Sequence, residues 1–270
     1  MAIGTGGSGG SKNPDTAFSA PYGMTTVGSY ATYANLHMKT YGTTSEQLAE
    51  IAVTMRQHAT LNPLAKMRNP ITIDDVLTSR MISRPLHLLD CCIISDGGGA
   101  VVVTSLDHAR DLRKKPVQIL GCGEAVQHQG VGYSDILSIA AKQSGAKALQ
   151  MAGVQHSDID LAMIYDSFTI TVLATLENLG FCPVGEGGDF VANGGISLQG
   201  SLPVNPDGGG LSSNHPGMRG IFLVIEAVKQ LRNECDARQV PNAEVALAHG
   251  TGGTIGDKHS GATLILGVDR

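Results

Sequence analysis

The sequence predicts an α/β protein in which helices pack on a mainly parallel or mixed β-sheet. From residue 117 onward, short apolar segments typical of strands alternate with segments typical of helices, which is the order of elements in this fold class. The predicted strands are continuous apolar runs, as expected of strands that are buried on both faces. Of the 270 residues, 42% are hydrophobic, 16% are charged and 35 are glycines, a composition that indicates a globular protein with many tight turns.

The first 115 residues predict mostly helices. A capping pattern, TSEQ from Thr44, begins a helix that Asn62-Pro63 ends. The region from about 14 to 84 is therefore expected to be a helical excursion, a lid or loop domain on a larger scaffold. Further helices are predicted over 27–40, 72–77 and 105–112, and two strands around a glycine turn within 85–104.

The pattern of strands and helices starts again after Lys114-Lys115-Pro116, the predicted boundary between two halves, residues 1–115 and 116–270. The first half is expected to be incomplete, because its glycine-rich start, MAIGTGGSGGSKNP, is typical of an internal loop. In the second half, strands are predicted over 117–122, 161–164, 244–248 and 262–266, and helices over 135–148 and 169–179.

Composition and charge argue against several classes of function. A net charge of −5 without a large Lys/Arg cluster argues against a nucleic-acid surface, and no apolar run is long enough to cross a bilayer. The five cysteines show neither metal-ligand nor redox spacing, so no metal or redox cofactor is implied. Cys91 and Cys92 fall in a predicted strand and are expected to be small buried hydrophobes. The odd number of cysteines and the lack of a secretory leader predict a cytoplasmic location.

A histidine between a glycine run and an apolar helix is the first candidate for chemistry. In NPDGGGLSSNHPGMRG (205–220), His215 follows Gly208–Gly210, whose backbone can take conformations closed to other residues and let a ligand come close. Pro216 suits the first turn of a helix. His215 is therefore expected at a helix N-terminus, where the dipole lowers the pKa of an imidazole and favours its neutral, basic form. The alternative is a helix-capping histidine in a tight turn. The predicted buried face of the helix consists of Met218, Ile221, Phe222, Ile225, Val228 and Leu231.

Two further elements could carry chemistry. YDSF, from Tyr165, stands where a predicted strand meets a helix, at the sheet edge where ligands bind in α/β folds. Tyr165 could donate a hydrogen bond to a carbonyl or a water, and Asp166 or Ser167 is expected to cap the following helix. In HGTGGTIG (249–256), consecutive glycines expose backbone N–H groups that can hold an oxyanion or a phosphate, and His249 could be a second acid/base group. The alternatives are a structural tyrosine and a glycine hairpin with a surface histidine.

Together, in this order and spacing, the three elements resemble the C-terminal half of the thiolase superfamily, in the branch of sterol-carrier-protein and lipid-transfer-type thiolases. YDSF at Tyr165 corresponds to the family's N/H-x-x-F motif, NHPG at Asn214 to its GHP motif, and HGTGG at His249 to its glycine-rich C-terminal loop. LENLGFCP (176–183) and RQVPNAEVALAHG (238–250) add to the likeness. The resemblance covers roughly the whole chain. It implies a thiolase-like layered α-β-α-β-α fold with an incomplete first half, and usually a homodimer.

The resemblance also implies a substrate and roles for residues. The substrate would be an acyl-CoA, with coenzyme A as substrate rather than cofactor, in carbon–carbon bond chemistry next to a thioester. His215 matches the base that activates a nucleophilic cysteine, Tyr165 the position that helps to hold a water or the thioester oxygen, and His249 lies in the loop that bears a second acid/base group. Substrate-binding residues are predicted in the oxyanion-binding loop and beside the two catalytic motifs: Gly252, Gly253, Asn214 and Asp166.

Departures from the family pattern leave three functions open. The first is an acyl-CoA acyltransferase of the thiolase type, acting in lipid metabolism by 3-oxoacyl-CoA thiolysis or Claisen condensation, but none of the five cysteines matches the family's nucleophile. The second is a retro-aldolase acting on a β-hydroxyacyl-CoA with an OB-fold partner subunit. Tyr165 is similar to a tyrosine of such thiolase-like enzymes, which by this likeness carry another tyrosine where this chain has His215. The third is a non-catalytic fragment that binds lipid or acyl-CoA.

Overall fold

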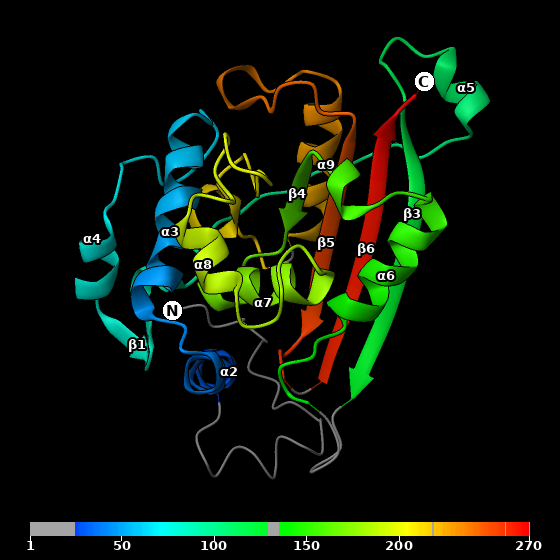
Figure 1. Cartoon of the computed structure of the whole chain (residues 1–270). Coiled ribbons are helices and arrows are strands. Elements are labelled where there is room, and N and C mark those ends of the chain that lie inside the picture. Colours follow the sequence, from blue (N-terminus) through cyan, green and yellow to red (C-terminus); the bar gives the residue numbers. More distant parts are fainter. Residues whose placement is uncertain (1–24, 129–134, 218, 257, 270) are drawn as a thin grey trace, which may run out of the picture.

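A mixed β-sheet lies at the centre of the molecule (Figure 1). The computed structural model describes residues 25–128, 135–217, 219–256 and 258–269. Within these residues the sheet has four strands, of which one neighbouring pair is parallel and the other two pairs are antiparallel: β4 (Leu161–Ile164) pairs parallel with β5 (Val245–Gly253), and β6 (Lys258–Val268) pairs antiparallel with β5 and with β3 (Val117–His128). In spatial order the strands are β3, β6, β5 and β4. The predicted α/β class with a mixed sheet is confirmed.

Helices cover both faces of this sheet. One face packs against α6 (Ala141–Ala152) and α7 (Thr169–Leu179), and the other against α9 (Gly220–Leu231). Successive side chains of a strand point to opposite faces, so Ile164 and Leu247 join the first core while Met163 and Ala248 join the second. The α7 bounds agree with the prediction, and α6 begins six residues later than the predicted 135.

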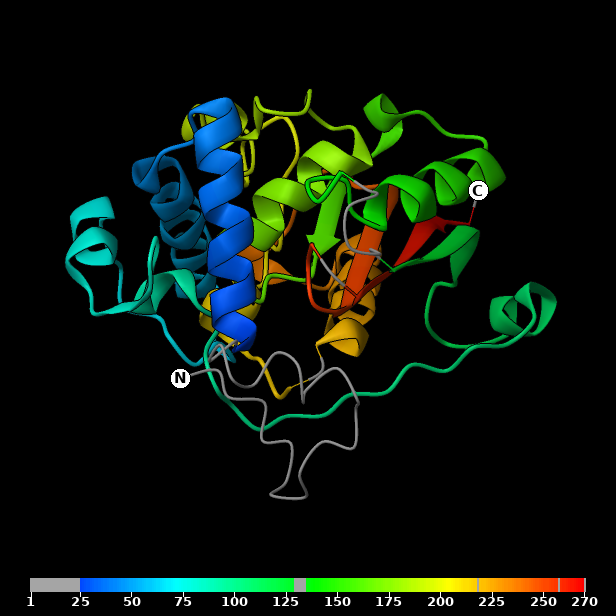
Figure 2. The same cartoon turned by 90° about the horizontal axis from the view of Figure 1, so that it is seen from below.

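The predicted helical excursion lies on the β4 side of the sheet (Figures 1 and 2). Thr44 and Gln47 form the expected capping box. The backbone N–H of Gln47 donates to the Thr44 hydroxyl at 3.3 Å, and the backbone N–H of Thr44 donates to the side-chain oxygen of Gln47 at 3.0 Å. The helices of this part are α2 (Thr26–Tyr41), α3 (Ser45–Thr60) and α4 (Ile73–Thr78). Helix α8 (Gly187–Ala192), which comes much later in the chain, packs against α3. The shorter elements are β1 (Met81–Ser83), β2 (Leu86–His87), η2 (Leu88–Asp90), α5 (Leu106–Arg110), η3 (His156–Asp158), η4 (Gly209–Ser213) and η5 (Asp236–Arg238).

The two strands predicted within 85–104 were wrong. Only β2 forms there, and residues 92–105 run without helix or strand to α5 (Figure 2). On the way they cross α9, where a side chain at Gly99 would overlap Ile225. Val102 and Val103 are 89% and 73% exposed. A strand needs a neighbour for its backbone hydrogen bonds. Cys92 and Ile93 donate to the carbonyl oxygens of Ser167 and Gly210, but among the described residues none bonds the backbone of residues 101–104.

The predicted buried face of α9 was also wrong in part. Leu223, Ala227 and Leu231 face the sheet, whereas Phe222 and Ile225 are half-buried on the other side. Met218, which was predicted on the buried face, lies outside the described residues. Because α9 is apolar almost all round, its spacing fits more than one face, and the sheet selected among them.

None of the helices in the described part of the chain is long and apolar enough to cross a bilayer. The predicted domain boundary falls in the irregular chain between α5 and β3. The division into two halves stays a prediction.

Candidate active site

Tyr165 continues the line of β4 by one residue. Its N–H donates to the carbonyl oxygen of His249 on β5 at 2.9 Å, and its half-buried ring packs with the core on the α9 face of the sheet. Helix α7 begins after Phe168 without a side-chain cap, because the Ser167 hydroxyl bonds the Thr171 hydroxyl at 3.1 Å. The predicted capping of α7 by Asp166 or Ser167 is therefore wrong.

The carboxylate of Asp166 instead binds the glycine turn ahead of His215. It accepts hydrogen bonds from the N–H groups of Gly210 (2.7 Å) and Leu211 (3.1 Å) and is fully buried. Burial raises the pKa of Asp166 to about 6, against the opposing effect of Arg219. The side chain predicted to contact substrate is thus occupied by the protein backbone.

The glycine run allows close packing of protein on protein rather than the approach of a ligand. Gly208 and Gly209 have φ of 97° and 66°, a region that other residues rarely adopt. A Cβ at Gly208 would lie 2.6 Å from the Cβ of Ala59 on α3, and one at Gly209 would overlap Asp166. The run leads into η4, a single π-helical turn. Glycine is therefore required here because Ala59 and Asp166 approach the backbone.

His215 and Tyr165 are brought together by these two turns. Their ring centroids are 5.3 Å apart and their planes meet at 68°, an edge-to-face contact. The backbone N–H of His215 donates a hydrogen bond to the Ser95 hydroxyl at 2.9 Å. The Nε2 atom of His215 is buried and has no hydrogen-bond partner among the residues that the structure describes. A free, basic ring nitrogen therefore lies beside a phenol.

Both groups of this pair are held in their neutral forms. Burial, and then the charge of Arg219, lowers the pKa of His215. Burial raises the pKa of Tyr165, so that its hydroxyl remains a donor. The predicted neutral state of His215 follows from burial and not from a helix dipole, because α9 begins five residues after it. The arrangement offers a base and a hydrogen-bond donor side by side.

His249 is not brought to this pair. It lies on β5 with its side chain on the α6 face of the sheet, where its Nδ1 bonds the Thr263 hydroxyl at 2.8 Å. It is fully buried, and burial, followed by the neighbouring His259, lowers its pKa to about 3. The structure gives no support to its predicted acid/base role. The alternative was a glycine hairpin with a surface histidine: β5 and β6 form that hairpin, but His249 is buried in it.

The predicted oxyanion-binding glycines lie at the end of β5. The carbonyl oxygen of His249 accepts a hydrogen bond from Tyr165, so the backbone groups of His249 point toward β4. Because the direction of backbone groups alternates along a strand, those of Thr251 also point toward β4 and those of Gly252 point toward β6. Gly253, with φ of 73°, ends the strand. The loop is tied to the YDSF turn by Tyr30 of α2, whose hydroxyl interacts with Ser167 and the backbone of Ile255. The loop is thus linked to the YDSF turn, whereas the backbone groups of Gly252 pair with β6.

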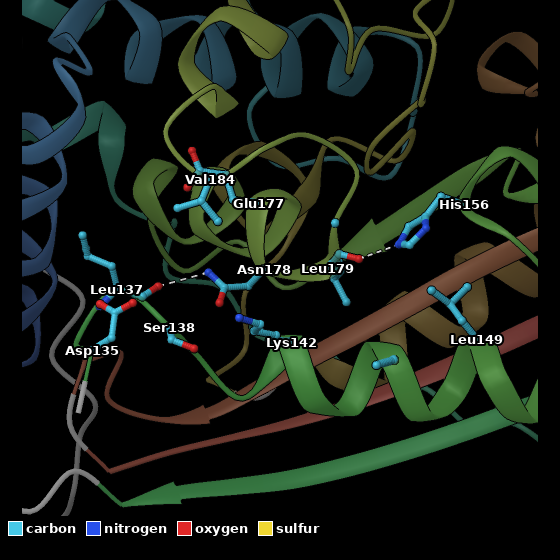
Figure 3. Close-up of a pocket in the computed structure, with 12 residues that line it drawn as sticks. Asp135, Leu137, Ser138, Lys142, Leu149, His156, Glu177, Asn178, Leu179 and Val184 are labelled. Carbon is cyan, nitrogen blue, oxygen red and sulfur yellow. Dashed lines mark hydrogen bonds between the residues drawn. The ribbon is translucent and has the colours of Figure 1, made fainter. Parts of the chain in front are cut away.

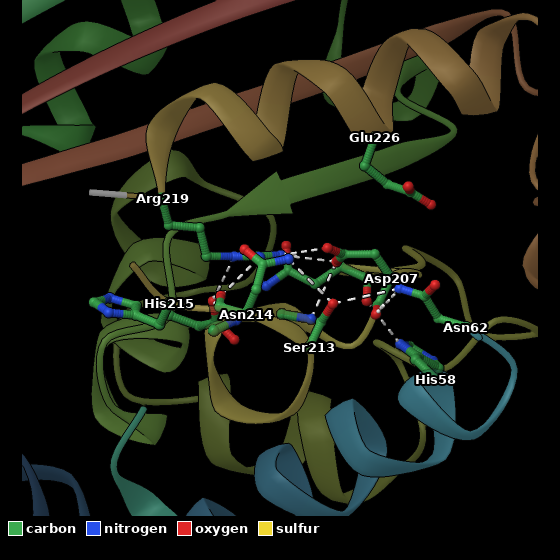
Figure 4. Close-up of polar contacts among 12 residues, drawn as sticks. His58, Asn62, Asp207, Ser213, Asn214, His215, Arg219 and Glu226 are labelled. Atoms are coloured by element: carbon green, nitrogen blue, oxygen red, sulfur yellow. Dashed lines mark hydrogen bonds and ion pairs between the residues drawn. The ribbon is translucent and has the colours of Figure 1, made fainter. Parts of the chain in front are cut away.

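Asn214 is engaged by the protein too. Its backbone carbonyl oxygen and its side-chain oxygen each accept a hydrogen bond from Arg219 at 3.1 Å (Figure 4). Arg219 and Asp207, which are joined by hydrogen bonds at this turn, were not among the residues predicted from the sequence. A charged residue at the start of an almost wholly apolar helix was the available signal, since such a charge is buried only with partners.

The four buried thiols are not activated as nucleophiles. Cys122 is exposed on the edge strand β3, and burial raises the pKa of the others. It rises to about 12 for Cys91, Cys92 and Cys182, and further for Cys235. A thiol with such a pKa is not a thiolate at neutral pH. The prediction that Cys91 and Cys92 are buried is confirmed, although they do not lie in a regular strand.

A cavity of about 280 Å³ lies elsewhere, between α6 and the end of α7 (Figure 3). Lys142, His156 and Asn178 are among its lining residues. His156 is engaged there through its Nε2 with the Leu179 carbonyl at 2.7 Å. The cavity contains none of the predicted site residues.

Comparisons with known proteins agree with these motifs. Residues 123–268 match the family described as thiolase C-terminal domain-like. The chain is 39% identical over 245 residues to an acetyl-CoA acetyltransferase of Methanothermobacter thermautotrophicus, covering 90% of this chain and 64% of that protein. It is 40% identical over 262 residues to a steroid side-chain-cleaving aldolase of Thermomonospora curvata, covering 94% and 65%.

A solved structure is similar over nearly the whole chain. It is described as an Ltp2-ChsH2(DUF35) aldolase and superposes with a TM-score of 0.86 at 39% identity, covering 96% of this chain and 69% of that one. The chain thus spans about two thirds of the length of these relatives. With the motif order and the mixed sheet, these matches show that the chain belongs to the thiolase superfamily.

Proposed function

We propose that the protein makes or breaks a carbon–carbon bond next to a CoA thioester, and that the reaction is retro-aldol cleavage of a β-hydroxyacyl-CoA. The observation that carries the proposal is the neutral imidazole of His215, with a buried and unpaired Nε2, in edge contact with the neutral phenol of Tyr165. A retro-aldol step needs a base and an acid beside a polarised thioester carbonyl, and it needs no thiol.

In the proposed reaction, His215 removes one proton from the substrate and later returns it. His215 takes the proton of the β-hydroxyl, the bond between the α and β carbons breaks, and the β carbon becomes a carbonyl. The electron pair of that bond forms the thioester enolate, whose oxygen accepts a hydrogen bond from Tyr165. Protonated His215 returns the proton to the α carbon, which leaves a shortened acyl-CoA.

Acyl transfer of the thiolase type is the second candidate, because His215 occupies the place of that family's base and a 39% identical relative is an acetyl-CoA acetyltransferase. Thiolysis or Claisen condensation through an acyl-enzyme would require an activated thiol. The raised pKa of Cys92 to about 12, so close to Tyr165, favours the retro-aldol reaction instead.

An OB-fold partner subunit and a homodimer are part of the proposal. The similar aldolase structure is described with a second component, ChsH2(DUF35). A partner of this kind would hold the acyl-CoA against the Tyr165–His215 pair.

Product analysis tests the choice between the reactions. The protein, with and without a DUF35-type partner, is incubated with a β-hydroxyacyl-CoA alone or with a 3-oxoacyl-CoA plus free CoA, and the acyl-CoA products are followed by mass spectrometry. The proposal requires chain shortening in the first mixture. Shortening only in the second would establish acyl transfer, and binding of acyl-CoA without turnover of either would establish a binding protein.

A further inference from the structure

We propose that Asp166, Arg219 and Asp207 form a buried charged bridge that sets the position of His215 relative to Tyr165. Asp166 would then be a positioning residue and not a substrate ligand. The inference rests on the proposed function only in treating this pair as the reacting groups.

Arg219 is the centre of the bridge (Figure 4). Its side chain is 0% exposed. One terminal nitrogen donates to both carboxylate oxygens of Asp207 at 2.8 and 2.6 Å, and the other donates to the two oxygens of Asn214. Its Nε lies 3.5 Å from Asp166 Oδ1, an ion-pair distance that is too long for a directed hydrogen bond.

Each end of the bridge belongs to one of the two turns that carry the candidate reacting groups. Asp166 follows Tyr165 directly in the chain and also accepts from Gly210 and Leu211 of the His215 turn. Asp207 accepts from the N–H of Gly209 at 3.0 Å. Because Arg219 binds the residue just before His215 as well, the position of that ring depends on both carboxylates.

Helix α3 and the residues that directly follow it support the same turn from the other side. Arg56 donates to the Ser212 hydroxyl at 2.9 Å, and Asn62 donates to the Asp207 carbonyl at 2.9 Å. These contacts hold the turn on the protein, but they do not reach Tyr165. The link between the two reacting groups runs through Asp166.

Energetics favour a role beyond stability for the bridge. Removing three charges from water is costly, and well-packed apolar side chains of similar volume often stabilise a protein as much. Charge-assisted hydrogen bonds from a guanidinium are, however, short and directional, so they fix the geometry of the groups they join. A displacement of about 1 Å in a reacting group can lower a rate about 100-fold.

The test compares D166N with E226Q, a control variant in a second buried ion pair. Glu226 and Arg238 pair at 2.8 and 3.1 Å, so E226Q removes an equally buried carboxylate charge outside the His215 turn. The NMR signals of the His215 ring protons are assigned by their loss in H215Q. In each variant, two quantities are then measured by NMR: the cross-peak between the His215 and Tyr165 rings, and the pKa of the His215 imidazole. Thermal melting reports the fold.

We expect D166N to lose the Tyr165–His215 cross-peak and to raise the His215 pKa toward its ordinary value, while E226Q keeps both. The sign of the pKa change is informative, because losing a negative charge without movement would lower the His215 pKa further. An unchanged cross-peak in D166N, or a further lowered pKa, overturns the proposal. If D166N does not fold, R219K gives the same readouts, since lysine keeps the charge but cannot reach Asp207 and Asn214 together.

Turnover separates this inference from the proposed function. If the wild type cleaves a β-hydroxyacyl-CoA, D166N should lower kcat about 100-fold with a much smaller change in KM. If the wild type cleaves nothing but the NMR changes occur, the positioning role stands and the proposed function fails. Turnover with an intact cross-peak in D166N would leave the function and remove the positioning role.

Discussion

His215 is half-buried and makes no side-chain hydrogen bond in the described structure, yet two turns of the chain hold its ring against Tyr165. At this scale the important quantity is the pKa of the imidazole. Burial and the nearby guanidinium of Arg219 both lower it, so the ring is neutral at physiological pH and able to accept a proton.

Replacing His215 with glutamine should remove the base. We expect H215Q to lower kcat by about 100- to 10,000-fold, with a melting temperature close to that of the wild type because no buried side-chain bond is lost. H108Q, in the exposed histidine of α5, is the control and should retain activity. A loss of folding that matches the loss of activity would return His215 to a structural role.

Replacing Tyr165 with phenylalanine isolates the hydroxyl from the ring. The phenylalanine ring can keep the edge-to-face contact with His215, so the melting temperature should change little. Loss of the donor to the enolate oxygen should lower kcat about 100-fold. Steady-state kinetics with a β-hydroxyacyl-CoA measure this, and a wild-type rate would show that the phenol is not the donor.

At the scale of elements, the close approach of β3 to α6 decides which residues can form the outer edge of the sheet. A Cβ at Gly123 would overlap the carbonyl oxygen of Ser144 and lie 2.9 Å from the N–H nitrogen of Ala148. Gly121 meets the same helix in the same way. The glycines of β3 therefore permit the helix to lie directly on the strand.

G123A should consequently destabilise the protein. A helix backbone cannot move aside as a flexible side chain can, so we expect the free energy of unfolding to fall by about 1–3 kcal/mol. G250A on β5 is the matched control, because a Cβ there would meet nothing within 4 Å. Urea unfolding measures both, and equal stability of the two variants would contradict the packing argument.

At the scale of the whole molecule, buried histidines make stability depend on pH. Burial lowers the pKa of His249 to about 3 and that of His259 to about 4. Between these values and the ordinary value of about 6.5, the unfolded chain binds more protons than the folded one. The free energy of unfolding should therefore fall with falling pH, by about 1.4 kcal/mol per pH unit for each histidine.

Unfolding in urea from pH 7 to pH 4.5 measures this slope. Asp166 has the opposite effect, because its pKa is raised to about 6 in the folded protein. Between about pH 6 and the ordinary pKa of an aspartate, the folded protein binds more protons at Asp166 than the unfolded chain does. Asp166 therefore offsets part of the loss of stability in this pH range. In H259N, an amide oxygen can replace the Nδ1 that accepts from Ala140, and the slope should fall by about one proton. A slope identical to that of the wild type would show that His259 is not the titrating group.

Local signals were sufficient for most elements of the fold. The TSEQ box, the apolar run of β4 and the bounds of α7 depend on residues close in the chain, and all agree with the structure. Motif order was sufficient for the family. It also singled out Tyr165 and His215, whose rings are in contact in the structure and whose catalytic roles stay a prediction. It was not sufficient for His249, because strand alternation turns that side chain to the other face of the sheet.

Only the tertiary structure decided the features that depend on contacts between residues far apart in the chain. Residues 101–104 have the composition of a strand but no described neighbour to bond, and α9 buries the face that the sheet selects. The neutrality of His215 comes from burial, and its place beside Tyr165 from Asp166, Asp207 and Arg219, which lie up to 53 residues apart in the chain. Periodicity and capping act over one or two turns of chain, whereas burial and ion pairing depend on which segments meet in space.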